Sequence, residues 1–452
     1  MADEGSPGTE VPGELQEPPL ATEQAEDPTA APESDIDLVA VAPEVLADSL
    51  EDYLKAWGRR IRAGESGALP IVVGLIVIII FFQIERSRFD SAINLVNLLT
   101  QAAVYVLLGA AEIFALILSE IDLSVGWVLA VGGFAIAELI APPVNFPWWL
   151  AILCGFGATA AIGYLQGTLI TRLHIPSFVV TLGGLLLFEG VAIELATIDK
   201  SAVGGVMSVS TTSPVFKLVN SNISPGVSWI ILVVVLAAFA TLSLSRASRR
   251  RSQGLTAPPL SITVLTIAVT AIGGVVLVYI CNLNRGLLTP LKGVPWVVPF
   301  VGLVLFAYSI LLGRTRVGRY MYAIGANPEA ARRAGVNVQG IRRLAFLLSA
   351  MTAGIAGLVY ISFLGSISTD VPGGNYTLYG VAAAVIGGAS LFGGRGKPVH
   401  ALLGGLVIGI VFNGLALMGI SAAGQYIATG IVLVVAAAVD ALVRRSGAGG
   451  AV

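Results

Sequence analysis

The side chains of this sequence that could do chemistry are a few ionisable and amide groups set inside apolar runs. Glu112, Asp122 and Glu189 lie within or beside such runs, where an ionisable group is costly and by default marks a function. Gln166 and Asn413 could offer amide groups to the hydroxyls of a polar solute. We therefore treat these five residues as candidates for lining a polar pathway.

Each candidate also has a structural interpretation, and the sequence leaves both open. Glu112 could hydrogen-bond a neighbouring helix in its neutral form, and Glu189 is central in its run and ambiguous. Asp122, which Ser124 follows two residues later, suits the N-cap of a helix. The two amides could equally make hydrogen bonds between helices.

The sequence has no pattern typical of covalent chemistry or of a metal site. No nucleophile is paired with a base, and His174 and His400 are too far apart in sequence to suggest a metal site. Cys154 and Cys281 fall in or beside different apolar runs, and we interpret them as small apolar fillers. The run Gly393–Pro398 (GGRGKP) lacks the spacing and the Ser or Thr of a phosphate-binding loop and should be a turn. We expect no catalytic residue, no metal and no cofactor bound by this chain.

The longest strongly polar segment within the apolar part of the chain contains a complete short helix. Asn327 can cap its first free amides, and Pro328 suits the first helical position. Glu329 lies near the positive end of the helix dipole, and Gly335 can take the left-handed conformation that ends a helix. At about 1.5 Å per residue it would be roughly 10 Å long, so it needs packing or a partner to persist. It is either a solvated connector or, as we favour, a docking site for a soluble partner. The segment comprises Asn327, Pro328, Glu329, Ala330, Ala331, Arg332, Arg333, Ala334, Gly335 and Val336.

Composition indicates an all-α polytopic membrane protein rather than a soluble enzyme. Of the 452 residues, 56% are hydrophobic and 12% are charged. Runs of about 20 apolar residues recur, which is the length that a helix needs to cross a bilayer. We predict about twelve spans, near residues 68–84, 93–118, 122–141, 148–171, 177–197, 227–244, 259–281, 295–312, 341–363, 375–392, 398–418 and 422–442.

The distribution of basic residues predicts that both ends of the chain are cytoplasmic. Lys and Arg collect on cytoplasmic loops, and an even number of spans puts both ends on one side. With the N-terminus inside, 20 of the 26 Lys and Arg residues fall on the cytoplasmic side and 6 fall outside.

The N-terminal part differs in composition from the rest. Residues 1–52 hold 15 acidic residues and no Lys or Arg, and such a segment cannot bury enough apolar surface to fold. Residues 44–62 have helical spacing and end in three arginines, which is typical of a helix lying on the cytoplasmic leaflet. The predicted division is an acidic disordered cytoplasmic tail (1–50), an interfacial helix (51–66), a transmembrane domain (67–445) with a cytoplasmic loop (313–340), and a C-terminal tail (446–452).

Part of the membrane domain repeats itself. The run TAAIGYLQGTLI matches LVIGIVFNGLAL, with Gln166 over Asn413, and with a different offset Gly126 falls over Gly380. Spans two to five would then repeat as spans nine to twelve. Because the copies lie seven spans apart, they would point in opposite directions. This is the inverted-repeat plan of many transporters, whose pathway lies at the repeat interface.

Four motifs follow one another along the membrane domain: EIDLSVGWVLAVGG, QGTLITRLHIPSFVVTLGG, GRYMYAIGANPEAARRAGVNV and AAVIGGASLFGGRGKPVHALLGGLVIGIVFNGLALMGIS. In these motifs the chain resembles the membrane permease of bacterial ABC importers for simple sugars, a group that includes the ribose, galactose and xylose permeases. The xylose-type branch is most similar in the basic loop RASRRRSQGL and the stretch NLNRGLLTP. Two features depart from the family pattern: the acidic N-terminal tail, and Glu120, where the family commonly has Gly before Ile-Asp-Leu-Ser.

The resemblance implies an assembly and a function. Two permeases would pair around a central pathway, cytoplasmic ATPase subunits holding ATP and Mg²⁺ would drive them, and an extracytoplasmic binding protein would deliver the sugar. Residues 327–336 would be the coupling helix that sits in a cleft of the ATPase. The chain would be a permease subunit in the bacterial inner membrane that imports a monosaccharide, such as the pentose xylose, with no nucleic-acid partner and no enzymatic activity of its own. The alternative is an ion-coupled secondary transporter that works alone.

Overall fold

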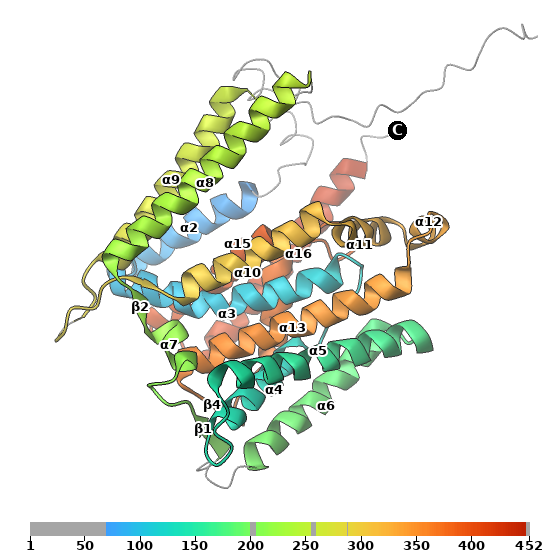
Figure 1. Ribbon diagram of the computed structural model, residues 1–452, viewed down its shortest axis with the longest axis horizontal. Coiled ribbons are helices and arrows are strands. Elements are labelled where there is room, and N and C mark those ends of the chain that lie inside the picture. The colour runs from blue at the N-terminus through green and yellow to red at the C-terminus, as the bar shows by residue number, and fades with distance from the viewer. Residues whose placement is uncertain (1–68, 199–204, 255–258, 287, 449–452) are drawn as a thin grey trace, which may run out of the picture.

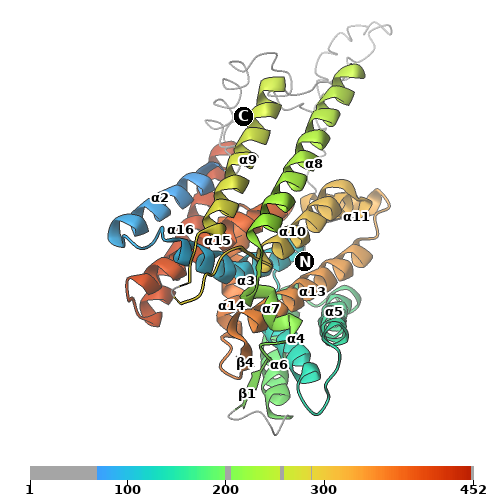
Figure 2. The same ribbon diagram turned by 60° about the vertical axis from the view of Figure 1, so that its left-hand side comes forward.

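The computed structural model describes residues 69–198, 205–254, 259–286 and 288–448 of the chain. The predicted acidic tail and interfacial helix lie outside these residues. In Figure 1 most of the long helices lie side by side across the view, and Figure 2 shows one hairpin projecting beyond them. The helices are α2 (Leu69–Glu85), α3 (Ala92–Leu116), α4 (Val125–Ile140), α5 (Trp148–Leu173), α6 (Ser177–Ile198), α7 (Pro214–Asn220), α8 (Pro225–Ser252), α9 (Leu260–Asn282), α10 (Val297–Arg314), α11 (Arg316–Ala326), α12 (Pro328–Arg333), α13 (Val338–Leu364), α14 (Gly373–Ile386), α15 (Pro398–Leu417) and α16 (Ala422–Ala448).

Two small antiparallel sheets join segments that are far apart in sequence. Strand β1 (Val206–Ser208) pairs with β4 (Ser366–Ser368), with Met207 opposite Ile367. Strand β2 (Asn222–Ile223) pairs with β3 (Val294–Pro295). These sheets tie the connections around α7 to the rest of the molecule and leave the helices as the main architecture.

The predicted all-α polytopic fold is confirmed. Each of the twelve predicted spans overlaps a helix of the described residues, although α14 ends at Ile386 and so stops short of the predicted end of the tenth span at residue 392. Eight of these helices are long and apolar enough to cross a membrane, namely α3, α5, α6, α8, α9, α10, α13 and α15. The others are α2, the short helices α4 and α14, and α16, which runs to Ala448 and so extends into the predicted C-terminal tail.

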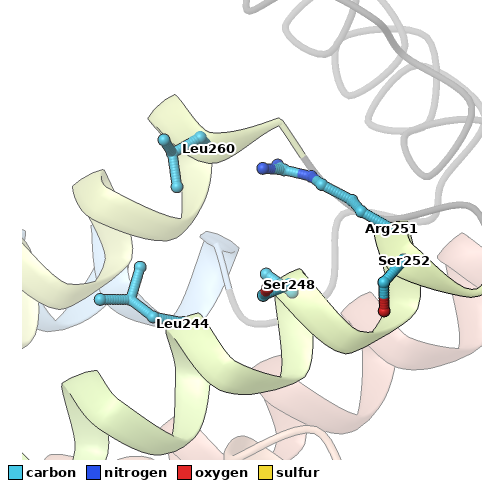
Figure 3. A pocket seen from close by; sticks show the side chains of 6 residues that line it. Leu244, Ser248, Arg251, Ser252 and Leu260 are labelled. Atoms are coloured by element: carbon cyan, nitrogen blue, oxygen red, sulfur yellow. The ribbon is translucent and has the colours of Figure 1, made fainter.

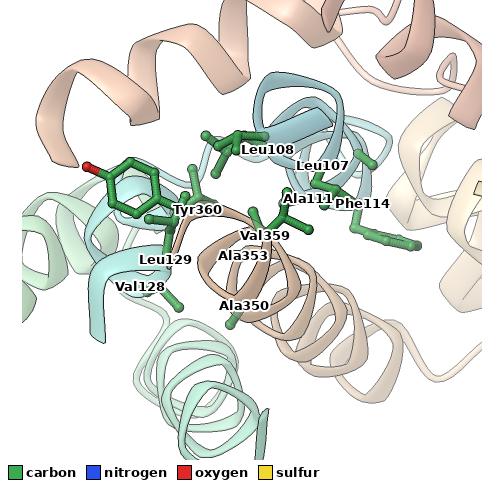
Figure 4. Close-up of a cluster of buried hydrophobic side chains, with 14 of the residues drawn as sticks. Leu107, Leu108, Ala111, Phe114, Val128, Leu129, Ala350, Ala353, Val359 and Tyr360 are labelled. Atoms are coloured by element: carbon green, nitrogen blue, oxygen red, sulfur yellow. The ribbon is translucent and has the colours of Figure 1, made fainter. Parts of the chain in front are cut away.

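The core of the molecule lies around α3 and α13. In the apolar stretches of these helices 83% and 72% of the residues are buried, against 6% for α8 and 11% for α9. Figure 4 shows the buried side chains of α3, α4 and α13 packed together, among them Leu107, Leu129 and Val359. The helices α8 and α9 therefore form the periphery.

The helix contacts follow the predicted inverted repeat. Helix α3 packs against α14 and α15, and its counterpart α13 packs against α4 and α5. The end of α3 meets the beginning of α13, because Glu120 pairs with Arg342 and Asp122 accepts a hydrogen bond from Ser349. The two helices are therefore antiparallel, as helices of an inverted repeat must be.

Small residues allow the two repeats to approach closely. Helix α5 crosses α13 at Gly163 and Gly167, and α15 crosses α3 at Gly405 and Gly409. A Cβ atom at Gly405 would lie 2.6 Å from the backbone of Val106, so no side chain fits there. Lipid is as apolar as these surfaces, so close packing is the main source of their association.

The predicted match of Gly126 in the third span with Gly380 in the tenth stays a prediction. A Cβ at Gly380 of α14 would lie 3.2 Å from the Leu108 side chain of α3. Gly126 itself lies against α14, where its N–H donates to Thr377 Oγ1 at 2.9 Å.

Candidate functional site

The N-terminus of α12 is capped as the sequence predicted. Asn327 Oδ1 accepts hydrogen bonds from the backbone N–H of Glu329 at 3.1 Å and of Ala330 at 2.9 Å. Pro328, which has no N–H to satisfy, occupies the first helical position. The Asn327 side chain thus accepts hydrogen bonds from two of the backbone N–H groups that a helix leaves without a partner at its N-terminus.

The C-terminus of α12 is closed by Gly335. Its φ is +80°, in the left-handed region, and no atom lies near the position of a Cβ. The N–H of Val336 then donates to the carbonyl oxygen of Ala331 at 3.0 Å, which is the hydrogen bond of a Schellman motif. The predicted stop is confirmed, and the helix ends at Arg333 with Ala334 as its C-cap.

Helix α12 offers most of its side chains to solvent. Glu329 lies 3.2 Å from Arg332 and 3.3 Å from Arg333, in pairs so exposed that each adds about 0.5 kcal/mol at most. Ala331 is buried and anchors the helix. Figure 1 places α12 at the extremity of the molecule, beyond α11 and the start of α13. A charged helix that is exposed apart from the buried Ala331 is suited to contact a partner.

Helix α11 fixes the position of α12. It lies so close to the end of α3 that a Cβ at Gly325 would collide with the carbonyl oxygen of Ile117. The Tyr322 hydroxyl donates to the carbonyl oxygen of Gly396. Burial raises the pKa of this hydroxyl above its usual value, so it keeps its proton and can donate at neutral pH.

The glycine-rich run after α14 is the predicted turn, and it packs against the same end of α3. The N–H of Gly394 donates to the Ile117 carbonyl at 2.9 Å, and the Ser119 hydroxyl donates to the Phe392 carbonyl at 2.9 Å. The end of α3, helix α11 and the α14–α15 turn therefore form one contact region directly behind α12.

Glu120 has a role in this region. Its Oε1 lies 3.3 Å from Arg342 Nε, and the Glu120 side chain is 13% exposed. The pair links the end of α3 to the first turns of α13, the helix that follows α12. A glycine at this position could not make this contact.

Asp122 is fully buried and held by its neighbours. Its Oδ1 accepts from the Ser124 N–H at 3.1 Å and the Ser124 hydroxyl at 2.7 Å, and its Oδ2 accepts from the Ser349 hydroxyl at 3.0 Å. The expected N-cap role is wrong, since Ser124 holds the N-cap position and Asp122 forms an Asx-type turn before it. The burial leaves Asp122 no surface for contact with a solute in this conformation.

Gln166 and Asn413 lie at opposite ends of α3. Gln166 Nε2 donates to the Ser124 hydroxyl at 2.9 Å, just after α3 ends. Asn413 Oδ1 accepts from Asn94 Nδ2 at 2.9 Å, where α3 begins. Both amides are buried and bind other helices, so the structure favours the interhelical interpretation. An inverted repeat separates equivalent residues in this way.

The two glutamates of the prediction have different surroundings. Glu112 in α3 is completely buried, and neither carboxyl oxygen has a hydrogen-bond partner among the described residues. Glu189 is half-buried on α6, a helix whose surface is largely exposed. The structure does not bring these two residues together, and their part in a pathway stays a prediction.

An aromatic cluster was missed by the sequence analysis. Tyr105, Tyr376, Tyr379 and Phe412 come from α3, α14 and α15, and their ring centroids lie 4.8 to 6.0 Å apart. Tyr360 joins them from α13, and Figure 4 shows its hydroxyl pointing away from the apolar core. The i, i+3 spacing of the tyrosines in α14 was the only local signal. Aromatic faces with hydroxyls can contact both the apolar and the polar groups of a ligand.

Comparison with known proteins assigns the chain to a protein family. Residues 94–437 match the family described as "Branched-chain amino acid transport system / permease component". The chain belongs to this family of permeases. No solved structure matches the chain.

Curated relatives of this permease are named as sugar transport components. It is 32% identical to the xylose transport system permease protein XylH of Escherichia coli over 376 residues, covering 83% of this chain and 92% of XylH. It is 28% identical to the fructose import permease protein FrcC of Rhizobium meliloti over 378 residues, covering 84% and 86% of the two chains. It is also 28% identical to the ribose import permease protein RbsC of Escherichia coli, covering 82% and 92%.

The permease is therefore a multi-pass membrane transport component. The resemblance to sugar permeases that the motifs predicted is confirmed across most of the chain.

Proposed function

We propose that this permease is the membrane subunit of an ABC importer for a monosaccharide, and that a separate ATPase drives it through α12. The observation that carries the proposal is the exposed, capped helix α12 at the extremity of a permease fold. ATP and Mg²⁺ would be bound by the ATPase partner rather than by this chain. A pentose such as xylose is our preferred substrate because XylH is 32% identical to this chain.

The contacts behind α12 suggest how motion would enter the membrane domain. A force on α12 reaches α11, which lies against the end of α3 and, through Tyr322, the α14–α15 turn. It also reaches α13, whose Arg342 pairs with Glu120. Helices α3 and α13 form the core, so a displacement of α12 would act on both repeats at once.

The proposed assembly has further members. Two copies of the permease would enclose the pathway, and an extracytoplasmic binding protein would deliver the sugar. The protein would lie in the bacterial inner membrane with both termini and α12 on the cytoplasmic side, in accord with the 20 basic residues assigned there among 26.

The proposal is tested by placing a charge on the exposed surface of α12. Ala334 is the exposed C-cap of α12, with φ −77° and ψ 8°, angles that a residue with a larger side chain can also adopt in the isolated permease. Ala334→Glu should lower uptake of labelled xylose by at least about tenfold, because an unpaired charge buried at an interface costs several kcal/mol. Uptake is measured in cells that contain the whole transporter, and immunoblots of membranes measure insertion.

Ala334→Ser is the matched control, since it adds a small polar group and should retain uptake. Unchanged uptake in Ala334→Glu at normal membrane levels would contradict docking on α12. The alternative of an ion-coupled transporter predicts that the purified chain alone takes up sugar into liposomes when a proton or sodium gradient is applied.

A further inference from the structure

Two short helices meet at their N-termini between the repeats. Helices α4 and α14 are the third and tenth predicted spans, and at about 1.5 Å per residue they are roughly 24 Å and 21 Å long. Both are shorter than a hydrocarbon core of about 30 Å. The Gly126 N–H of α4 donates to the Thr377 hydroxyl of α14, and a Cβ at Gly373 would lie 2.4 Å from the Trp127 ring. Short helices at corresponding positions of an inverted repeat commonly border the solute site of a transporter.

The aromatic cluster begins one turn into α14, beside this junction. Tyr376 is the fourth residue of the helix. The centroid of its ring lies 5.5 Å from that of Tyr360 and 6.0 Å from those of Tyr105 and Tyr379. The Tyr376 hydroxyl also interacts electrostatically with four other hydroxyls, those of Tyr105, Tyr360, Tyr379 and Tyr426. Hydroxyl groups from α3, α13, α14 and α16 therefore converge on one region.

Two polar groups at this junction lack a hydrogen-bond partner. Tyr379 is 8% exposed and Trp127 is 6% exposed. The Tyr379 hydroxyl and the Trp127 indole N–H are buried, and neither has a partner among the described residues. Buried Tyr and Trp side chains usually find one, and a buried polar group without a partner destabilises the conformation that buries it. A ligand hydroxyl that reached these groups would remove this penalty.

The aromatic cluster is suited to an uncharged ligand that carries several hydroxyl groups. With Tyr426 included, it offers rings and hydroxyls and no charged side chain; its members are Tyr105, Tyr360, Tyr376, Tyr379, Phe412 and Tyr426. A ring face accepts apolar C–H groups, and a phenol hydroxyl can both donate to and accept from a ligand hydroxyl. A monosaccharide presents both features, because C–H groups lie on the faces of its ring and hydroxyls lie around its edge.

The aromatic cluster extends from the interior to the surface, at the end of the molecule away from α12. Tyr360 lies four residues before the end of α13, whose other end follows α12, and Figure 4 shows its hydroxyl pointing away from the apolar core. Tyr376 is half-buried, and Tyr426 is 47% exposed. A solute can therefore approach at Tyr426, whereas the Tyr379 hydroxyl becomes accessible only when the rings move apart.

A cavity of about 560 Å³ between the end of α8 and the start of α9 differs from the aromatic cluster in this respect (Figure 3). The Ser252 hydroxyl in its lining already donates to the Arg249 carbonyl oxygen at 2.9 Å, and Arg251 already has an interaction partner. Two of its polar side chains are thus engaged within the protein. The size of a cavity therefore does not locate a polar ligand here, and the groups without partners do.

We propose that the aromatic cluster is a contact site for the monosaccharide on its way through the permease. One face of the sugar lies on the rings of Tyr105 and Tyr376, and a sugar hydroxyl bonds to the Tyr379 hydroxyl as the rings separate. The inference rests on the proposed function for the class of ligand and adds the residues that contact it. Because the sugar satisfies the Tyr379 hydroxyl, it favours the separated arrangement of the rings over the closed one.

Tyr379→Phe tests the site, because it removes the unpartnered hydroxyl and keeps the ring. Xylose, ribose and fructose are each titrated into the full-length permease in nanodiscs, and saturation-transfer NMR, which detects weak binding, measures the Kd. For a sugar that the unaltered permease binds, Tyr379→Phe should raise the Kd about fivefold, the equivalent of about 1 kcal/mol for one lost hydrogen bond. The melting temperature without sugar should be unchanged or higher, because the closed cluster loses no hydrogen bond.

Tyr279→Phe is the matched control. Tyr279 lies on the peripheral helix α9 and is 59% exposed, so its loss of a hydroxyl should leave the Kd unchanged. Equal Kd values for Tyr379→Phe and the unaltered permease, or binding of none of the three sugars, would overturn the inference. A lower melting temperature of Tyr379→Phe would show that the hydroxyl has a structural partner and would also overturn it.

Uptake of the same three labelled sugars by cells that contain the whole transporter separates this inference from the proposed function. Uptake together with an unchanged Kd in Tyr379→Phe would reject the contact site alone and leave the proposed function standing. Absence of both uptake and binding would reject the two together.

Discussion

At the scale of single residues, the buried polar groups of this permease mostly serve the packing of helices. Asp122 accepts three hydrogen bonds from Ser124 and Ser349, and Gln166 and Asn413 each bond to a residue of another segment. A polar side chain in a membrane suggests function by default, but a group whose bonding capacity is filled by the protein has little left for a solute. The carboxylate of Asp122 is filled in this way, whereas the Oε1 atom of Gln166 has no hydrogen-bond partner among the described residues.

Asp122→Ala should destabilise the protein. The change leaves the Ser349 hydroxyl and the Ser124 N–H without their acceptor in a buried site. We expect the free energy of unfolding to fall by about 1–3 kcal/mol, measured by thermal unfolding in detergent. Asp370→Ala removes the same group from an exposed position and should have little effect. Equal stability of Asp122→Ala and the unaltered protein would show that the network is not structural.

At the scale of helices, glycines decide where the two repeats touch. A Cβ at Gly163 of α5 would lie 2.4 Å from the Phe346 carbonyl oxygen, whereas nothing lies within 4 Å of a Cβ at Gly157 of the same helix. The sequence predicted close packing for glycines in general. It could not tell which glycines do this, because the facing helix is supplied by a segment almost two hundred residues away.

Gly163→Ala and Gly157→Ala form a matched pair on α5. We expect Gly163→Ala to lower the free energy of unfolding by about 1–3 kcal/mol, because the added methyl group collides with the backbone of α13. Gly157→Ala should be neutral or slightly stabilising, since alanine favours a helix more than glycine does. Thermal unfolding of both purified variants checks the difference. If the two substitutions had the same effect, α5 would not meet α13 through this face.

At the scale of the whole molecule, the two antiparallel repeats exchange packing partners. Helix α3 of the first repeat packs against α14 and α15 of the second, and α13 of the second packs against α4 and α5 of the first. Helix α12 projects from one end of this arrangement. The end of α3, the α14–α15 turn and α11 gather behind α12, so this end is rigidly connected to the core. The other end holds Asn413 with Asn94, and α7 lies on α13 through Ser362. The proposed function requires that these two ends face opposite sides of the membrane.

Cysteine labelling tests that orientation. In a Cys154→Ser background, we expect an impermeant maleimide to label Lys217→Cys on α7 in intact spheroplasts. Ala330→Cys on α12 should be labelled only after the membrane is opened. Both positions are exposed, and the remaining Cys281 is buried. Labelling of Ala330→Cys from outside would rule out contact between α12 and a cytoplasmic ATPase.

The sequence alone determined those features that depend on neighbouring residues or on composition. The cap of Asn327, the helix end at Gly335, the helices at the twelve predicted spans and the sequence family all follow from short-range patterns, since local hydrogen bonds and the bilayer thickness act on consecutive residues. Only the tertiary structure decided the contact of Asp122 with Ser349, the opposite positions of Gln166 and Asn413, and the aromatic cluster. Each of these depends on helices that are distant in sequence, and their contacts follow from how whole surfaces fit together.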